Sequence, residues 1–257
     1  MQAVAAPAAA RVEFADLGRA LALGWRDFCA APQFGILFGA IYVACGLSIW
    51  AVLRLWNIPW AILPLAVGFP LIGPFVAVGL YEVSRRLSRG ERPRWGPVLA
   101  VVLGERNRQI PWMSAVIVGV FLAWLFIADV IFALFLGLGP HMRGQTLQDV
   151  LASPDGLAML AVGSLVGAAI ALVLYAITVV SLPLLLDREV DFVTAMLVSI
   201  RVVRMNPAPM LAWAALIAVL MFLALLPAFL GLMVVLPVLG HASWHLYARA
   251  VAPEAGR

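Results

Sequence analysis

Six long apolar stretches dominate this sequence, and they leave the chain few ways to fold in water. Each holds about 20 or more mostly apolar residues, the length that a helix needs to cross the hydrocarbon core of a bilayer. The last two stretches are separated only near Leu226 and Pro227, but one helix through both would be about twice the length of a single crossing. The sequence therefore predicts six transmembrane helices, at approximately residues 34–56, 59–81, 111–138, 157–183, 208–226 and 228–248.

The composition excludes a soluble globular domain. Of the 257 residues, 65% are hydrophobic and 12% are charged, whereas soluble domains average about 45–50% apolar and about 25% charged residues. A soluble chain of this size could not cover so much apolar surface. We therefore expect an all-α, polytopic membrane helix bundle. It should comprise one membrane domain at 14–250, a disordered N-terminal tail at 1–13 and a C-terminal tail at 251–257.

The placement of arginine predicts the orientation. The chain has 17 basic residues and all are arginine. Fifteen lie in the N-terminal segment, the loops after the second and fourth spans and the C-terminal tail; only Arg54 and Arg143 lie in the alternate loops. Because basic residues favour the cytoplasmic side, both termini should be cytoplasmic. We expect a bacterial inner membrane, with the arginine-rich loop contacting anionic lipid headgroups, and no nucleic acid as a partner.

Two shorter segments, 14–29 and 191–205, have the periodicity of amphipathic helices. Their apolar residues recur at spacings of three and four, and each segment ends shortly before a proline, Pro32 or Pro207. Both helices should lie in the cytoplasmic interface. Asp16 and Asp191 each precede their proline by sixteen residues, which indicates either a parallel internal repeat or convergent composition. The apolar faces consist of Phe14, Leu17, Leu21, Trp25 and Phe28 in the first segment and Phe192, Met196, Ile200 and Val203 in the second.

Three runs of sequence together resemble a known family. They are Gly79–Arg86 (GLYEVSRR), Ser181–Arg188 (SLPLLLDR) and Pro237–Tyr247 (PVLGHASWHLY). These runs resemble a bacterial family of predicted integral membrane proteins, domain of unknown function 2189, over about residues 14–250. The resemblance implies a six-helix inner-membrane protein and supplies no known activity.

Asp129 is the one acidic residue inside a predicted span. A carboxylate in hydrocarbon is costly and usually faces a partner or water. At about 1.5 Å per residue from Pro111, Asp129 lies about 27 Å along the third span, near the expected depth of Arg54. The residue is therefore interpreted as a structural partner of Arg54 or a solvated outer-end residue, with an ion or substrate path as the alternative.

His241 and His245 are four residues apart and share one helix face. Neutral imidazoles at that spacing can bind a metal ion or haem. However, the remaining histidine, His141, is expected on the opposite side of the membrane, and no cysteine or carboxylate cluster joins the pair. We expect no cofactor and no metal, and we interpret the pair as a polar patch that hydrogen-bonds neighbouring helices.

Two further pairs of charged residues follow spans on the cytoplasmic side. Glu82 and Arg85 follow the second span, and Asp187 and Arg188 follow the fourth. Such residues can form ion pairs that fix the bundle ends, or an inner gate. Because exposed ion pairs contribute little energy, the sequence favours the structural role.

Small residues and prolines complete the pattern. The pairs Gly35–Gly39 and Gly163–Gly167 permit close helix contact within the chain or between chains. Prolines at 64, 70 and 74 predict a broken or kinked second span, a feature of transporters.

The sequence contains no catalytic or nucleotide-binding motif. It favours a non-enzymatic protein that contacts other membrane subunits, as an accessory or assembly component of a larger bacterial membrane complex. The alternatives are a small-solute transporter or channel, and a haem- or metal-binding membrane protein.

The arginine distribution makes a direct prediction about topology. A reporter fused within residues 139–155 should read as periplasmic, because this loop carries only one arginine, Arg143. Fusions at either terminus provide the matched cytoplasmic control. A cytoplasmic reading at 139–155 would overturn the six-span arrangement.

Overall fold

The computed structural model describes residues 7–51, 62–105, 107–137 and 147–252, and within them the chain is all helical. The one β contact among these residues is an isolated antiparallel bridge between Ala9 and Val251. The helices are α1 (Phe14–Ala30), α2 (Pro32–Ala51), α3 (Ile62–Ser88), α4 (Trp95–Glu105), α5 (Ile110–Leu136), α6 (Leu147–Ala152), α7 (Pro154–Thr178), α8 (Ser181–Asp187), α9 (Phe192–Met205), α10 (Pro207–Leu225) and α11 (Leu232–Ala250).

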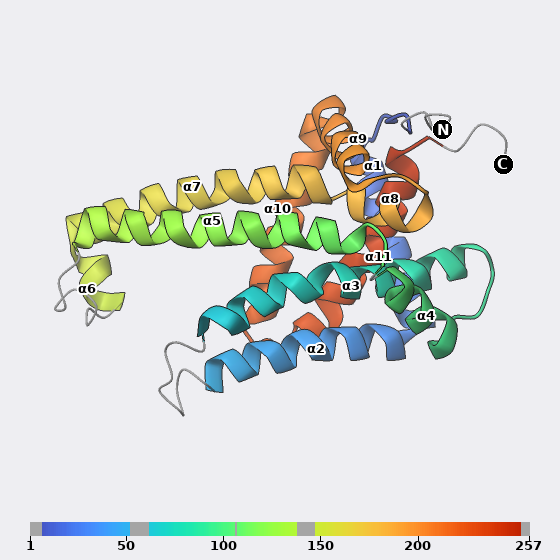
Figure 1. Ribbon diagram of the computed structural model, residues 1–257, viewed down its shortest axis with the longest axis horizontal. Coiled ribbons are helices and arrows are strands. Elements are labelled where there is room, and N and C mark those ends of the chain that lie inside the picture. Colours follow the sequence, from blue (N-terminus) through green and yellow to red (C-terminus); the bar gives the residue numbers. More distant parts are fainter. Residues whose placement is uncertain (1–6, 52–61, 106, 138–146, 253–257) are drawn as a thin grey trace.

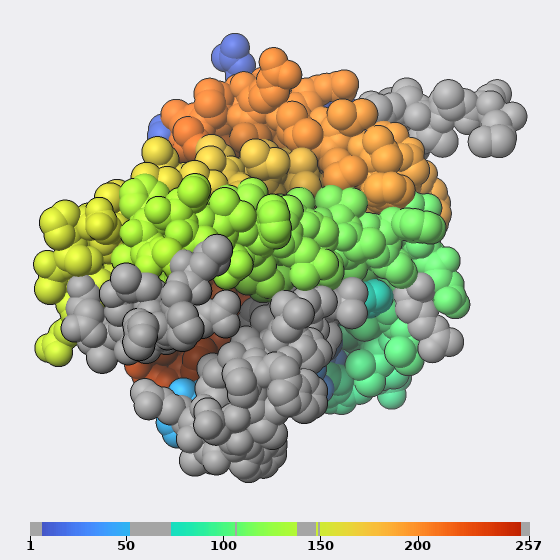
Figure 2. All heavy atoms as spheres, turned by 60° about the vertical axis from the view of Figure 1, so that its left-hand side comes forward, coloured from blue at the N-terminus to red at the C-terminus, as the bar shows by residue number. Residues whose placement is uncertain are grey.

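The helices form a compact body and a projecting pair (Figure 1). Helices α5 and α7 lie side by side and extend together beyond the rest of the bundle. Helices α1, α4, α8 and α9 gather at the opposite end, where the last helix, α11, also ends. Seen from the far end of the pair, α5 and α7 form a continuous band across the molecule (Figure 2). We call α5 and α7 the arm, and the end that holds α1, α4, α8 and α9 the collar.

The predicted all-helical architecture is confirmed, with four helices long and apolar enough to cross a membrane among the described residues. They are Pro32–Ala51, Ile110–Leu136, Pro154–Asp187 and Pro207–Leu225. The remaining two predicted spans coincide with α3 and α11. Since α11 carries His241, Ser243 and His245, it is less apolar than the four candidate spans, and the count of six spans stays a prediction.

The last two apolar stretches form two helices, as predicted from the excessive length of a single helix through both. Helix α10 ends at Leu225 and α11 begins at Leu232. Between them Ala228 and Phe229 have positive φ angles of 51° and 67°, the left-handed conformation that lets a chain reverse in a short turn. Pro227 therefore lies in the turn and does not kink one long helix.

The structure differs from the sequence predictions in the second span and in its following loop. The prolines predicted a broken or kinked span; helix α3 is continuous from Ile62 to Ser88, so the break is absent and the kink stays a prediction. The arginine-rich loop contains α4, an 11-residue helix that is too short to qualify as a span. The ring centroid of Trp95 lies 4.1 Å from that of Phe34, and this contact fixes α4 against α2.

The described part of the predicted N-terminal tail is paired with the end of the chain. Ala10 N donates to the carbonyl of Ala250 at 2.8 Å, and Val12 N donates to Oδ1 of Asn206 at 2.8 Å. Residues 8–12 thus differ from the expected disordered tail, because backbone groups at 250–252 and the Asn206 amide supply partners that the local sequence does not reveal.

The two amphipathic segments form α1 and α9, but their aspartates occupy different positions. Asp16 is the third residue of α1, where its carboxylate accepts from Glu13 N. Asp191 is the N-cap of α9 and accepts from Thr194 N at 2.9 Å. Each helix is followed at once by a proline-initiated helix, α2 or α10. The shared order supports a repeat and the unequal caps argue against it, so the repeat stays a prediction.

Glycines set the closest contacts of the body. A Cβ at Gly39 of α2 would lie 2.7 Å from the Cα of Met233 in α11. A Cβ at Gly24 of α1 would lie 2.6 Å from Ala242 N and 2.7 Å from the carbonyl oxygen of Val238, both in α11. Helix α11 is therefore packed between α1 and α2 at backbone distance, which only residues without a side chain permit.

Gly24→Ala should destabilise the body. The added methyl group meets backbone atoms of α11, which cannot rotate away, so α1 must shift at a cost of about 1–3 kcal/mol. The measurement is the thermal unfolding temperature in detergent. Gly18→Ala is the matched control, because a Cβ there has no heavy atom within 4 Å and alanine is the better helix former. Equal unfolding temperatures for the two variants would contradict the packing.

Candidate functional site

Four polar side chains from three helices meet inside the collar end of the body. We call Asp27 of α1, Ser84 of α3, and His241 and His245 of α11 the polar junction. Nε2 of His245 donates to Oδ2 of Asp27 at 2.7 Å. Oγ of Ser84 lies 2.8 Å from Nδ1 of His241, with the donor set by the histidine tautomer. Asp27, Ser84 and His241 are buried, so these contacts replace water for groups that need partners.

The junction controls the ionisation of Asp27. Burial raises the pKa of this carboxyl. The hydrogen bonds from His245 and Ser84 act in the opposite direction, and the net pKa lies below its ordinary value. Arg26 adds a cation 3.6 Å from Oδ1. Asp27 is therefore held as a carboxylate, and the ionised form binds α1 to α11.

The buried histidine retains one unused position. Nε2 of His241 has no hydrogen-bond partner among the described residues. Because Ser84 is fully buried, its hydroxyl is shielded from any substrate in this conformation. The described residues contain no group of three or more His, Cys, Asp or Glu side chains arranged to share a metal ion. The arrangement is chemically suited to holding helices together. His245 contacts Asp27 of α1, and His241 contacts Ser84 of α3.

Glu82 and Arg85 lie one turn from the junction and form an ion pair. Oε2 of the fully buried Glu82 is 2.5 Å from Nη2 of Arg85, and Oε1 is 2.6 Å from Nε of Arg86. Arg85 also donates to the carbonyl of Leu186 at 3.4 Å, which joins α3 to α8. Two guanidinium groups on one buried carboxylate make this an interior contact, in contrast to the exposed pair expected from sequence.

Asp187 and Arg188 form separate contacts. Asp187 accepts a hydrogen bond from the Tyr247 hydroxyl at 2.8 Å, and Arg188 donates to the carbonyl of Ala252 at 2.6 Å. Both contacts fasten the end of α8 to α11 and the C-terminal segment. These two residues thus join the collar elements together, at a site distinct from the Glu82 pair.

Asp129 lies apart from all of these groups. It is exposed on α5, and no described residue forms a hydrogen bond or ion pair with it. Arg54, the partner considered from sequence, lies outside the described residues. The exposed side chains of Leu122 and Phe126 share its face of the helix.

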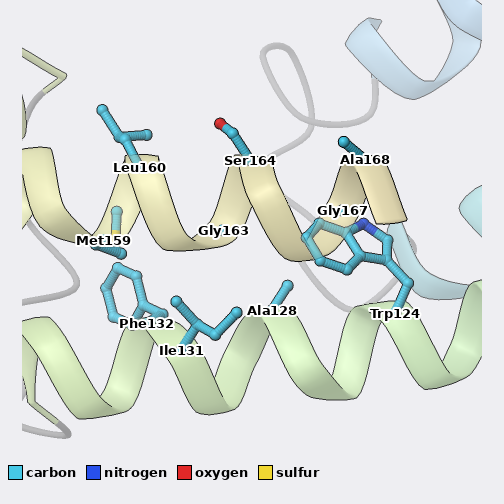
Figure 3. Close-up of a pocket in the computed structure, with 10 residues that line it drawn as sticks. All are labelled: Trp124, Ala128, Ile131, Phe132, Met159, Leu160, Gly163, Ser164, Gly167 and Ala168. Carbon is cyan, nitrogen blue, oxygen red and sulfur yellow. The ribbon is translucent and has the colours of Figure 1, made fainter. Parts of the chain in front are cut away.

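The arm carries an open apolar groove between α5 and α7, with a volume of about 610 Å³. In Figure 3 the indole of Trp124 lies against Gly167, while Phe132 lies beneath Met159 further along. Half of the residues that line this α5–α7 groove are small: Ala128 on α5, and Gly163, Ser164, Gly167 and Ala168 on α7. The other half are large and apolar: Trp124, Ile131 and Phe132 on α5, and Met159 and Leu160 on α7. A Cβ at Gly167 would lie 2.9 Å from Trp124, whereas one at Gly163 would meet no heavy atom within 4 Å.

Sequence reasoning found the two histidines but missed Asp27 and Ser84. Asp27 lies on the polar side of an amphipathic helix, where a solvated carboxylate is the default interpretation. Ser84 lies in the first family-like run and both histidines lie in the third, and the structure brings these two runs together. That shared membership of family-like runs was the one available signal for Ser84.

The family resemblance is confirmed by comparison with known proteins. The apolar helices define an all-helical integral membrane protein. A family model described as predicted integral membrane protein (DUF2189) matches residues 62–187, from the first residue of α3 to the last of α8. The matched region includes Glu82, Ser84 and Arg85 and excludes the two histidines. No curated protein and no solved structure matches the chain.

Asp27→Asn should weaken the body at neutral pH by about 1–3 kcal/mol, because a charged hydrogen-bond acceptor for His245 becomes neutral. Since the folded-state pKa of Asp27 is lowered, its stabilisation is present above the unfolded pKa of about 4 and is lost as the pH falls below it. Unfolding temperatures in detergent at pH 7 and pH 3 should therefore differ less for the variant than for the native protein.

Asp155→Asn is the control for this experiment, because Asp155 is an exposed residue in the first turn of α7. It should leave the unfolding temperature within the range of ordinary surface substitutions. If Asp27→Asn behaved like this control at pH 7, the junction would not hold α1 in place.

Proposed function

We propose that this integral membrane protein is a non-enzymatic accessory or assembly component of a larger bacterial membrane complex, and that it binds the complex through the α5–α7 arm. The observation that carries the proposal is the α5–α7 groove. Among the described residues, it is an apolar concavity with small residues at its centre, around Gly163 and Gly167, on helices that are long enough to cross a bilayer.

The burial of the candidate spans supports this assignment. In α2, 39% of the most apolar window is buried inside the chain, against 6% in α5 and 0% in the helix that begins at Pro154. The body thus has its own internal packing, whereas few side chains in the apolar windows of the arm are fully buried inside the chain. Helix association within lipid depends on close van der Waals packing, and small residues permit it. The groove around Gly163 has that character, and none of the described residues fills it.

The placement of the charged groups also supports a packing role. The ion pairs of the described residues lie at the collar, where they join α1, α3, α8 and α11. A transporter coupled to an ion gradient needs charged or coordinating groups near the middle of the membrane. In the described spans, the candidate for such a group is Asp129. Its side chain is on an exposed face of α5, which favours a contact with a neighbouring protein over a path through the bundle.

A transporter or channel remains the second candidate because of one cavity in the body. A space of about 240 Å³ lies between α2, α3, α10 and α11, and its lining includes the hydroxyl-bearing residues Tyr42, Tyr81 and Ser243. Solute flux through the purified chain alone in proteoliposomes, abolished by Ser243→Leu, would favour this function.

The haem- or metal-binding alternative rests on His241 and His245, whose described contacts are to Ser84 and Asp27.

Gly163→Leu should abolish assembly while leaving the isolated protein intact. The new side chain occupies open space in the groove, so it blocks a partner helix without disturbing α5. Gly104→Leu on α4 is the matched control, because a Cβ there also meets no heavy atom within 4 Å. Affinity purification in mild detergent, followed by mass measurement, compares the stoichiometric membrane subunits retained by each form.

The proposal requires that the native protein and Gly104→Leu retain the same subunit and that Gly163→Leu loses it, with equal unfolding temperatures for all three. Purification of the native chain as a lone monomer would contradict the accessory function. Retention of the subunit by Gly163→Leu would remove the groove from the interface.

A further inference from the structure

Asp129 is an exposed carboxylate on the apolar surface of α5. It lies 19 residues after Ile110 and 7 before Leu136, so it is about 28 Å from the first residue of α5 and about 10 Å from the last. The exposed side chains on its face are large and apolar: Phe126 is 71% exposed and Leu122 is 43% exposed. A carboxylate that lies within the hydrocarbon core needs a partner, since lipid tails offer none.

The described part of the chain does not supply that partner. Its arginines belong to the N-terminal segment, the end of α3 and the residues around α4, the segment from α8 to α9, and the end of α11. These elements form the collar, and Asp129 is near the far end of the arm. No described residue pairs with Asp129, and it is the one acidic residue inside the apolar part of α5.

We infer that Asp129 contacts a basic side chain on a transmembrane helix of the protein that covers the arm. This inference rests on the proposed accessory function and adds the chemistry of the partner. Opposite charges in a low-dielectric region attract strongly, and each relieves the desolvation of the other. A second copy with the same orientation would place a second aspartate at this depth, so a different protein fits the charge better.

The groove and the carboxylate form one contact surface on the arm. Ala128 lines the groove, and Asp129 is rotated by about 100° from it on the same turn of α5. A partner that fills the groove therefore passes beside the flank that carries Asp129. Packing in the groove supplies close approach, and the carboxylate fixes the depth and identity of the partner helix.

Charge reversal tests the inference. Asp129→Arg should reduce the fraction of co-purifying subunit by at least about tenfold, because two basic groups then meet in the interface. Asp129→Asn should have a smaller effect, since an amide oxygen still accepts a hydrogen bond. Asp155→Arg is the matched control, because this exposed residue lies in the first turn of α7 and outside the proposed contact. It should retain the subunit.

Second-site changes identify the partner residue. Reversal of one basic residue within a span of the subunit should restore assembly with Asp129→Arg. If Arg54→Asp in the same chain restores it instead, the partner is internal and the inference is overturned. The inference also fails if the retained subunit is a second copy of this chain.

A labelling experiment on the native protein avoids any question of folding. A hydrophobic carbodiimide reacts with carboxyl groups that are accessible from lipid. Asp129 should be labelled slowly in native membranes and at least about tenfold faster once the chain is separated from its subunit in detergent. Equal labelling rates would overturn the inference.

These outcomes separate the inference from the proposed function. If the native chain retains a subunit that Gly163→Leu loses, and Asp129→Arg retains it fully, the accessory function stands and the role of Asp129 is wrong. If the native chain retains no subunit, both are wrong.

Discussion

The hydrogen bond between Asp27 and His245 holds the first described helix of the chain against the last. In an apolar interior a carboxylate and an imidazole must satisfy each other, because water is absent and an unpaired polar group is costly. The contact places α1 so closely on α11 that Gly24 has no room for a side chain. Ser84 and His241 extend the same network to α3. The collar therefore forms one closed unit built from residues more than 150 positions apart in sequence.

The same requirement has the opposite consequence on the arm. There Asp129 faces outward among exposed apolar side chains, and the described residues leave it without a partner. Glu82, by contrast, has two guanidinium groups within 2.6 Å. The described residues thus pair the buried carboxylate of Glu82 at the collar, whereas the carboxylate of Asp129 is exposed on the arm. The described residues leave the groove beside that carboxylate open, which supports our proposal that the arm contacts another protein.

Hydropathy and periodicity predicted the helices well, because both depend on local composition. The amphipathic segments 14–29 and 191–205 correspond closely to α1 and α9, and each predicted span coincides with a helix. Long-range pairing was not predictable in this way. Asp27 has the sequence environment of a surface residue, and only the fold brings His245 to it. Helix α4 was missed because a search for stretches of about 20 residues passes over an 11-residue helix.

The central claim, that the arm is covered by another protein, is tested most directly by oxygen accessibility in native membranes. Nitroxide labels at Phe126 and Leu134 on α5 can be compared with one at Phe222 on α10, which is 64% exposed, after replacement of Cys29 and Cys45. The account predicts that the two α5 labels are shielded from oxygen in native membranes and become as accessible as the α10 label when the purified chain is reconstituted alone. Equal accessibility of all three labels in native membranes would contradict it.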